Sequence, residues 1–410
     1  MRINLRIGIG KLLAASLLLA LTHVPASAQS RIVAIGDVHG SLPPFVSLLG
    51  QMKLVDPKRG DKGDWTGGRS TFVQTGDVVD GGPKSRACLD LLMNLERSAQ
   101  KQKKGKVVFL LGDHEIMGMT GDLRYVSRED FQSFATKQSE KARQAAYREY
   151  QSFLAERKRV GVAPAQAISE QEWMAEHPAG YFERRDAFSP QGVYGRWLRQ
   201  HGIAYQEGGG VFVHAGLSPN STFASIDELN AQMRGALLAF DRGWQSLANA
   251  GIIWQYMSID EAIVEIQRER AAIPLRETDD PKRREELDKF IELLTWLRSP
   301  DHPAWYLGLA EEAEPLLAPS LQAMMTRLKI SFIVAGHLSA PGAVIRQRFD
   351  NRVFLIDTAM MQGNSGGRAA ALEIDGGRFV ARTPGEAPQN LLAPGTHPDS
   401  NPAGPAAVQP

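Results

Sequence analysis

Five short apolar runs of the chain lead directly into an aspartate or a histidine, and this recurrence most limits what the chain can fold into. The runs are Arg31–Ile35, Thr71–Thr75, Lys106–Leu111, Val211–Val213 and Ile330–Ala335. Continuous apolar runs of this length, bounded mostly by glycine, are typical of strands buried on both faces. Helical sequence separates the first three runs, as in βαβ units. Because open α/β sheets bind ligands at the carboxyl ends of their strands, we expect the polar positions to share one edge.

The composition narrows the class of protein. With 410 residues, 43% of them hydrophobic and 23% charged, the chain can form a large globular core. Lys and Arg number 47 against 46 Asp and Glu, and a dedicated nucleic-acid binder would carry a basic excess, so we expect no nucleic-acid partner. The single cysteine, Cys88, excludes a disulfide framework and a thiolate metal cluster. Any bound metal must therefore be held by carboxylates and histidines.

Residues 1–28 have the three parts of a secretory signal peptide. Arg2, Arg6 and Lys11 form a basic region, Leu12–Leu21 an apolar region, and a small-residue cleavage site ends at Ala28. A membrane-spanning helix needs about 20 apolar residues, which this run does not reach. We expect cleavage after Ala28 and export, to the periplasm, with no membrane segment in the mature chain.

The mature chain reads as one domain with insertions. We expect the domain over residues 29–382, with largely helical insertions at about 127–200 and 260–300. In the second insertion, Asp280-Pro281 is a good helix start, and a stripe of apolar residues follows it. Residues 383–410 are rich in Pro, Gly, Ala and Asn, and their composition predicts a disordered tail.

The polar residues at the strand ends form a set suited to metal ions. They are Asp37, His39, Asp77, Asp80, Asp113, His114, His214 and His337. Carboxylates and neutral imidazoles together suit borderline divalent ions such as Mn, Fe or Zn. Two such ions about 3.5–4 Å apart can activate a water molecule and hold the oxygens of a transferring phosphoryl group. Each residue alone could be a helix cap or turn residue, but that interpretation does not explain why they recur at successive strand ends.

The motifs around these residues resemble those of a known family. Gly-Asp-Val-His-Gly (36–40), Gly-Asp-Val-Val-Asp (76–80) and Gly-Asp-His-Glu (112–115) look like the three ordered motifs of the calcineurin-like metallophosphoesterases. His-Ala-Gly-Leu-Ser-Pro (214–219) and Gly-His (336–337) resemble the later histidine motifs of the phosphoprotein-phosphatase branch. Residues 121–126 and 65–68 are similar to segments of the bacterial Shewanella-like phosphatases. The resemblance implies a two-sheet α/β/β/α sandwich with helical cap insertions.

The resemblance also implies a role for each residue. Asp37, His39 and Asp77 would bind one divalent ion. Asp77 would bridge to a second ion, completed by Asp113, His214 and His337. His114 would be the general acid, oriented by Asp80. The implied protein is an exported phosphatase that hydrolyses phosphate monoesters of proteins or small molecules by attack of a metal-activated hydroxide.

Three positions depart from the family pattern. Asp113 stands where the family usually has Asn, and Gly81 and Leu307 stand where relatives often carry Arg. These departures remove groups that would help hold a phosphate dianion, so restoring Asn at position 113 or Arg at position 81 is expected to strengthen substrate binding. The nearest replacements in the sequence are Arg124, Arg86 and Arg196, each of which could equally be an ordinary salt-bridge partner.

Two other functions fit the same motifs. One is hydrolysis of phosphoric anhydrides or diesters, including nucleotides. The other is a catalytically attenuated domain that binds metal and recognises anionic partners. The motifs fix neither the metal nor the substrate.

Overall fold

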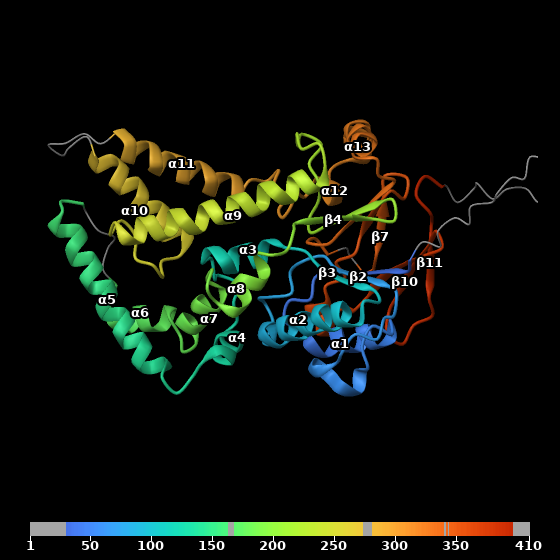
Figure 1. Ribbon diagram of the computed structural model, residues 1–410, viewed down its shortest axis with the longest axis horizontal. Helices are drawn as coiled ribbons and strands as arrows, with labels where there is room; N and C mark the ends of the chain where they lie inside the picture. Colours follow the sequence, from blue (N-terminus) through green and yellow to red (C-terminus); the bar gives the residue numbers. More distant parts are fainter. Residues whose placement is uncertain (1–29, 163–167, 274–280, 340–341, 343, 397–410) are drawn as a thin grey trace, which may run out of the picture.

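Two β-sheets packed against each other form one part of the molecule in the computed structural model, on the right in Figure 1. The structure describes residues 30–162, 168–273, 281–339, 342 and 344–396, so the predicted signal peptide (1–28) lies outside the described residues. Within these ranges, no helix combines the length and the apolarity needed to cross a bilayer.

The first sheet has the strand order β11-β10-β9-β1-β2-β3. Its strands are β1 (Ile32–Ile35), β2 (Thr71–Gln74), β3 (Lys106–Phe109), β9 (Ala371–Asp375), β10 (Arg378–Arg382) and β11 (Gln389–Leu391). Strands β1, β2 and β3 are parallel, and β9 pairs antiparallel with β1. The first three runs predicted from the sequence are thus the parallel half of this sheet.

The second sheet has the strand order β4-β5-β6-β8-β7. Its strands are β4 (Ala204–Glu207), β5 (Gly210–Val213), β6 (Phe332–Ala335), β7 (Arg346–Arg348) and β8 (Val353–Leu355). Strands β5, β6 and β8 are parallel, with β4 and β7 antiparallel at the two edges. The remaining two predicted runs are therefore its central strands.

Alternation along the strands divides the core into two parts. In β1, Ile32 and Ala34 belong to the cluster between the sheets, whereas Val33 and Ile35 belong to the larger cluster under the helices. Phe212 of β5 and Val334 of β6 meet them from the second sheet. Because successive side chains of a strand point to opposite faces, each central strand is buried on both sides, as the apolar runs predicted.

Helices cover the outer faces and extend to one side of the sheets. Those near the sheets are α1 (Leu42–Gln51), η1 (Pro57–Lys62), α2 (Ser85–Gln102), α3 (Asp113–Thr120), α12 (Gly308–Glu311), α13 (Glu314–Leu328) and η3 (Met360–Ser365). Figure 1 shows α1 and α2 on one side of the sheets and α13 on the other. This helix–sheet–sheet–helix arrangement is the fold class that the sequence predicted.

In the part of them that the structure describes, the two predicted insertions are helical and lie together beside the sheets (Figure 1). Their helices, with the long α9, are α4 (Arg128–Phe134), α5 (Ser139–Arg159), α6 (Glu170–Glu176), α7 (Tyr181–Phe188), α8 (Val193–Leu198), α9 (Ile226–Asn249), α10 (Ile259–Ala272) and α11 (Pro281–Leu297). Buried ion pairs join α5 to α10, where Arg157 contacts Glu265 at 3.4 Å and Glu269 at 2.8 Å.

The predicted disordered tail is wrong for residues 383–396, whereas residues 397–410 lie outside the described residues. Strand β11 pairs antiparallel with β10 and forms the edge of the first sheet. The Gln347 side chain donates to the Leu392 carbonyl at 2.7 Å and accepts from the Leu392 N–H at 3.0 Å. An edge strand is held by its backbone, so a segment that lacks large apolar side chains can still be ordered.

Candidate metal centre and active site

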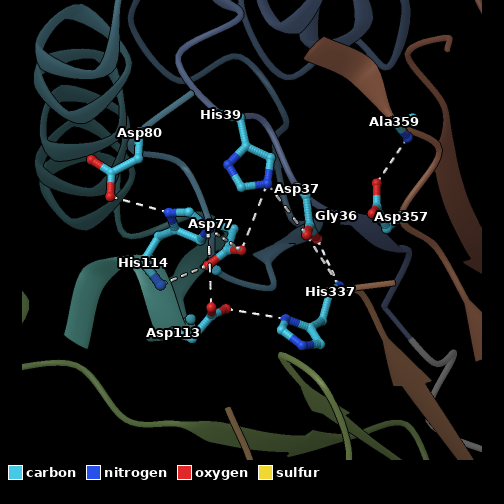
Figure 2. Close-up of polar contacts among 12 residues, drawn as sticks. Gly36, Asp37, His39, Asp77, Asp80, Asp113, His114, His337, Asp357 and Ala359 are labelled. Carbon is cyan, nitrogen blue, oxygen red and sulfur yellow. Dashed lines mark hydrogen bonds and ion pairs between the residues drawn. The ribbon is translucent and has the colours of Figure 1, made fainter. Parts of the chain in front are cut away.

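The predicted polar residues gather where the central strands of both sheets end (Figure 2). Asp37 lies two residues after β1, Asp77 three residues after β2, and Asp113 is the first residue of α3, which follows β3. His214 directly follows β5, and His337 lies two residues after β6. The edge expected from the sequence therefore exists, and it is shared by the two sheets.

Four of these side chains form the first donor group. Asp77, Asp113, His214 and His337 each offer one ligand atom, and these atoms all lie within 4.8 Å of one another. Asp113 Oδ1 lies 2.9 Å from His214 Nε2 and 3.1 Å from His337 Nδ1, and His214 Nε2 lies 3.4 Å from Asp77 Oδ2. The structure thus brings together the four residues predicted to bind the second metal ion.

A second donor group adjoins the first and shares Asp77. It consists of His39, Asp77 and His114, again with ligand atoms within 4.8 Å of one another. His39 Nε2 lies 3.7 Å from Asp77 Oδ2 and 3.8 Å from Asp37 Oδ2, while His114 Nε2 lies 3.9 Å from Asp77 Oδ2. The sequence grouped Asp37 with His39 and Asp77. In the structure, His114 stands in this group beside His39 and Asp77.

The site gathers several buried carboxyl groups close together. Burial raises the pKa of Asp37 well above its ordinary value, and the nearby Asp357 raises it further. Burial likewise raises the pKa of Asp77, with Asp113 adding to the effect. Burial alone would also raise the pKa of Asp113, but hydrogen bonds to two imidazoles hold it well below its ordinary value. Such a cluster of buried carboxylates is stabilised by a cation.

The histidines of the site are suited to bind that cation as neutral ligands. Burial lowers the pKa of His39 to about 4 and also lowers the pKa of His214. With an ion bound, a neutral His214 ring would carry its proton on Nδ1, 3.0 Å from the Thr75 carbonyl, and would offer the lone pair of Nε2, the atom that faces Asp113, to the ion. Oxygen and nitrogen donors converging in this way fit divalent transition metals.

Glu115 holds the loops that carry the ligands. Its fully buried carboxylate accepts hydrogen bonds from the backbone N–H groups of Asp77 (2.8 Å), Val78 (2.9 Å), Val79 (3.3 Å) and Gly112 (2.9 Å). The loop after β1 is tied to the same segment, because the N–H of His39 donates to the Asp77 carbonyl at 2.9 Å. One carboxylate therefore fixes the second motif against the third.

Backbone strain is concentrated at the site. His39, Asp77, Asp80 and His337 all have positive φ, between 45° and 70°. Non-glycine residues in this region cost about 1–3 kcal/mol each and persist only where the surrounding structure holds them. Gly76 has φ of 104°, and a Cβ there would lie 2.6 Å from the backbone nitrogen of Gly112. Glycine is required at this position because two ligand-bearing loops touch there.

His114 is oriented by a buried chain of charged groups. Its Nδ1 lies 3.1 Å from Asp80 Oδ2, and the other oxygen of Asp80 pairs with Arg184 of α7 (Figure 2 draws the first contact). Burial lowers the pKa of His114, but the hydrogen bond to Asp80 and the charges of the nearby carboxylates Asp113, Asp80 and Glu115 together raise it above its ordinary value. His114 Nε2 then faces the donor groups and can carry a proton.

A cavity is lined in part by two aromatic residues that contact histidines of the site. It has a volume of about 240 Å³, and Tyr125 and Trp305 form part of its lining. The Tyr125 ring lies 5.2 Å from the His114 ring, and the Trp305 ring meets the His337 ring edge-on at 6.1 Å. The cavity is thus next to both the predicted general acid and a predicted ligand.

The three candidate substrate arginines have different surroundings. Arg124 lines this cavity, and its guanidinium pairs with Asp122 at 2.7 Å and with Asp260 at 2.8 Å. Arg86 is exposed on α2 and donates to the Ser133 carbonyl at 2.9 Å. Arg196 is exposed on α8. Within the described residues, no hydrogen bond or ion pair joins any of the three to a predicted metal ligand, and Arg124 is the one that lines the cavity containing Tyr125 and Trp305.

The positions that depart from the family pattern have clear local settings. Gly81 has φ of 73°, its N–H donates to the Tyr125 carbonyl at 2.9 Å, and a Cβ there would overlap the Met361 sulfur. Leu307 is 37% exposed and is the N-cap residue of α12. An arginine at position 81 would be strained at this positive φ. The backbone therefore argues against the gain in substrate binding expected from restoring arginine there.

Three residues that shape the site were not among those predicted from the sequence: Arg184, Asp357 and Glu115. Arg184 belongs to an insertion, and no spacing in the sequence relates it to Asp80. Asp357, which raises the pKa of Asp37, follows β8, a strand that the sequence did not identify. Glu115 lies within a recognised motif, and its position three residues after Gly112, as in a capping box, was a usable signal.

Comparisons with known proteins give relatives at the level of family and fold. The family described as "Calcineurin-like phosphoesterase" matches residues 30–340. An uncharacterized protein of Schizosaccharomyces pombe is 26% identical over 340 residues, which is 82% of this chain and 75% of that protein. "Shewanella-like protein phosphatase 2" of Arabidopsis thaliana is 31% identical over 216 residues, which is 52% of this chain and 53% of that protein. The chain thus spans about half the length of the Arabidopsis relative.

A solved structure shares the fold. The "Cold-Active Protein-Tyrosine Phosphatase" of a psychrophilic Shewanella has a TM-score of 0.56 and 21% sequence identity, covering 89% of this chain and 81% of that chain. The resemblance predicted from the motifs is therefore confirmed at the level of family and fold.

Proposed function

The chain belongs to the calcineurin-like phosphoesterase family, and we propose that it is a phosphatase that hydrolyses phosphate monoesters with two divalent metal ions. The observation that carries the proposal is the pair of donor groups sharing Asp77. A carboxylate common to two sites is what an enzyme needs to hold two cations close together, because it reduces their repulsion. His114, backed by Asp80, lies at the same place.

We assign the ligands as the sequence predicted them. Asp37, His39 and Asp77 would hold one ion, and Asp77, Asp113, His214 and His337 the other, with Mn, Fe or Zn as the metal. When bound, the ions would supply positive charge against the phosphate oxygens and lower the pKa of a water molecule. His114 would donate the proton on Nε2 to the leaving oxygen, since Asp80 holds the Nδ1 side of the ring.

Phosphoproteins are the proposed substrates, with phosphotyrosine preferred over phosphoserine. Tyr125 is 54% exposed and its ring lies beside His114, at the position from which a proton reaches the leaving group. An aromatic leaving group could pack there against Tyr125 and Trp305. The printed names of the Arabidopsis and Shewanella proteins, a protein phosphatase and a protein-tyrosine phosphatase, support this choice.

A metal analysis combined with a panel of phosphate esters tests the proposed function. The protein should contain two divalent ions, hydrolyse an aryl phosphate monoester, lose this activity with a chelator and regain it with Mn²⁺. Higher activity on dinucleotides or on phosphodiesters than on monoesters would replace the proposal with an anhydride or diester hydrolase. Two bound ions with no turnover of any ester would make the chain a metal-binding recognition domain.

The substrate preference has its own test. Tyr125→Ala should lower kcat/KM for a phosphotyrosine peptide more than for the matched phosphoserine peptide. An aromatic contact is worth about 0.5–1.5 kcal/mol, so the difference should be about two- to tenfold. Equal losses on both peptides would show that Tyr125 does not select the leaving group.

We also propose that the protein is exported, as the pattern in residues 1–28 predicts. The chain recovered from the periplasm should then begin at Gln29. A chain that retains residues 1–28 and stays in the cytoplasm would contradict this proposal without affecting the proposed chemistry.

A further inference from the structure

We propose that Arg184, supplied by the helical insertion, is a positioning residue for catalysis that fixes Asp80 and, through Asp80, the general acid His114. The inference rests on the proposed function, because it assigns Arg184 a part in protonating the leaving group. It makes the insertion part of the catalytic apparatus and not only a cover beside the sheets.

The contacts of Asp80 carry the argument. Its two carboxylate oxygens face different partners: Oδ2 lies 3.1 Å from His114 Nδ1, and Oδ1 pairs with Arg184 Nη2. Asp80 also has positive φ, and its backbone N–H donates to Ser85 Oγ at 3.0 Å. The orientation of the Asp80 carboxylate, and with it that of the imidazole, is therefore set from the side opposite His114.

Arg184 is itself held on several sides. Its Nε lies 3.3 Å from Asp130 Oδ2, and its guanidinium carbon lies 4.5 Å from the centre of the Phe188 ring. Arg184, Asp80 and Asp130 are all fully buried. A guanidinium has fixed planar geometry, so a buried one with defined partners holds a carboxylate in one orientation.

Charge balance supports the same role. Asp80 and Asp130 would place two negative charges in the interior, and within the described residues Arg184 is the cation paired with both. Removing one partner of a buried ion pair leaves an uncompensated charge, so the Asp80 carboxylate would turn toward another donor. His114 would then lose the oriented acceptor that keeps its ring in place.

A merely structural role makes a different prediction. Arg184 also joins α7 to α4, which carries Asp130, and a simple anchor would affect all substrates equally when removed. A residue that acts through the general acid matters only when the leaving group needs a proton. Dinitrophenolate is a weak base and leaves without one, whereas phenolate, with a conjugate-acid pKa of about 10, benefits from protonation.

The experiment compares phenyl phosphate with 2,4-dinitrophenyl phosphate in the full chain loaded with Mn²⁺. For Arg184→Met, kcat on phenyl phosphate should fall by about tenfold or more, and kcat on dinitrophenyl phosphate by less than about threefold, since general acid catalysis contributes about 10²–10⁴. KM should change little for either ester, because Arg184 does not line the donor groups. Asp80→Asn should show the same selectivity with a larger loss, and Arg184→Lys a smaller one.

Arg157→Met is the matched control. Arg157 is also a buried arginine of the insertions, paired with two carboxylates, but it contacts neither Asp80 nor His114. Its variant should lose thermal stability without changing the ratio of the two rates. If Arg184→Met does not fold, Asp130→Asn removes the charge of the second partner of Arg184 and weakens its hold on the guanidinium, and it should change the ratio in the same direction.

Each result has a distinct meaning. Equal losses on both esters in Arg184→Met, or in Asp130→Asn where that variant is needed, would overturn the inference and leave Arg184 a structural anchor. If the unmodified protein loaded with Mn²⁺ hydrolyses neither ester, the proposed function fails, and the inference fails with it.

Discussion

Asp113 is the residue at which this site departs most directly from its family. Its Oδ1 contacts both His214 and His337, and these hydrogen bonds keep the pKa of Asp113 low, so the carboxylate stays charged at neutral pH. A carboxylate can ligate a metal as an amide oxygen does, but it offers no N–H to substrate and it repels an incoming dianion. The departure thus acts on substrate binding more than on metal binding.

Asp113→Asn should therefore improve the enzyme toward phosphate monoesters. A charge-assisted hydrogen bond contributes about 1.5–3 kcal/mol, so kcat/KM should rise by about tenfold or more while the metal content is unchanged. Asp357→Asn is the control, since it removes another buried carboxylate near Asp37 but lies outside both donor groups. A similar gain in both variants would mean that only the total charge matters. No gain with the metal retained would show that the site is adapted to Asp113.

The sequence predicted the site residues that lie in its motifs. It did not predict those that the fold alone brings close to the site. Asp37, Asp77 and His337 follow apolar runs, so periodicity and spacing located them. Arg184 reaches Asp80 from more than 100 positions away, and nothing local to either residue indicates the pairing. The sequence also could not show that φ at Gly81 is 73°, which changes what an arginine would do there.

At the scale of elements, β11 shows how composition can mislead. The segment after Arg382 has few large apolar residues, yet β11 completes the first sheet through backbone pairing with β10. Further hydrogen bonds join this segment to the β7–β8 region: the N–H of Gly395 donates to the Asp350 carbonyl at 2.7 Å, and the Asn351 side chain donates to the Thr396 carbonyl. The apolar runs predicted the central strands because those are buried, whereas an edge strand leaves no such pattern.

Removing residues 383–410 should consequently destabilise the domain. The truncation loses the β10–β11 pairing and the contacts of Leu392 and Gly395, and each net hydrogen bond contributes about 0.5–1.5 kcal/mol. We expect the unfolding free energy to fall by about 2 kcal/mol or more in urea denaturation. A shorter truncation after Thr396 keeps all of these contacts and serves as the comparison. Equal stability of the two truncated chains would mean that β11 contributes nothing to the domain.

At the scale of the whole molecule, the buried carboxylates link metal binding to stability. The raised pKa of Asp77 means that its ionised form is disfavoured in the fold, so the metal-free protein is destabilised at neutral pH by its own site. A cation bound only by the folded state adds stability that grows with concentration, by about 2.7 kcal/mol at 100 times Kd. Asp77 therefore lowers the stability of the metal-free protein and, as a ligand, raises that of the metal-bound protein.

Asp77→Asn should separate these effects. Without metal at pH 7.5, the variant should have a Tm equal to or above that of the unmodified protein, because Asn removes the buried charge and can still accept the hydrogen bond from the His114 N–H. Addition of Mn²⁺ should raise the Tm of the unmodified protein and have little effect on the variant. A full Mn²⁺-dependent shift in Asp77→Asn would contradict the bridging assignment.

His302 links the stability of the whole molecule to pH. The ring is 2% exposed, and burial lowers its pKa from 6.5 to about 4. His302 lies in the loop that supports His214, because the carbonyl of the next residue, Pro303, accepts the N–H groups of Ala215 and Gly216 at 3.1 and 3.2 Å. Its Nδ1 accepts the N–H of Ala304 at 3.2 Å, and within the described residues its Nε2 has no hydrogen-bond partner. The folded state therefore favours the neutral ring.

The sign of the pH effect follows from this preference. Above pH 6.5 the ring is neutral in both states, so His302 imposes no penalty, and below this value the unfolded chain takes up a proton that the folded chain refuses until pH falls to about 4. Stability should thus decrease from pH 7 to pH 5, by roughly 2 kcal/mol from this residue alone. His302→Asn keeps an acceptor for Ala304 and removes the titration. Urea denaturation at pH 7 and pH 5 should show a smaller loss in the variant, while the site carboxylates contribute equally to both proteins. The same pH dependence in both proteins would mean that His302 is protonated within the fold.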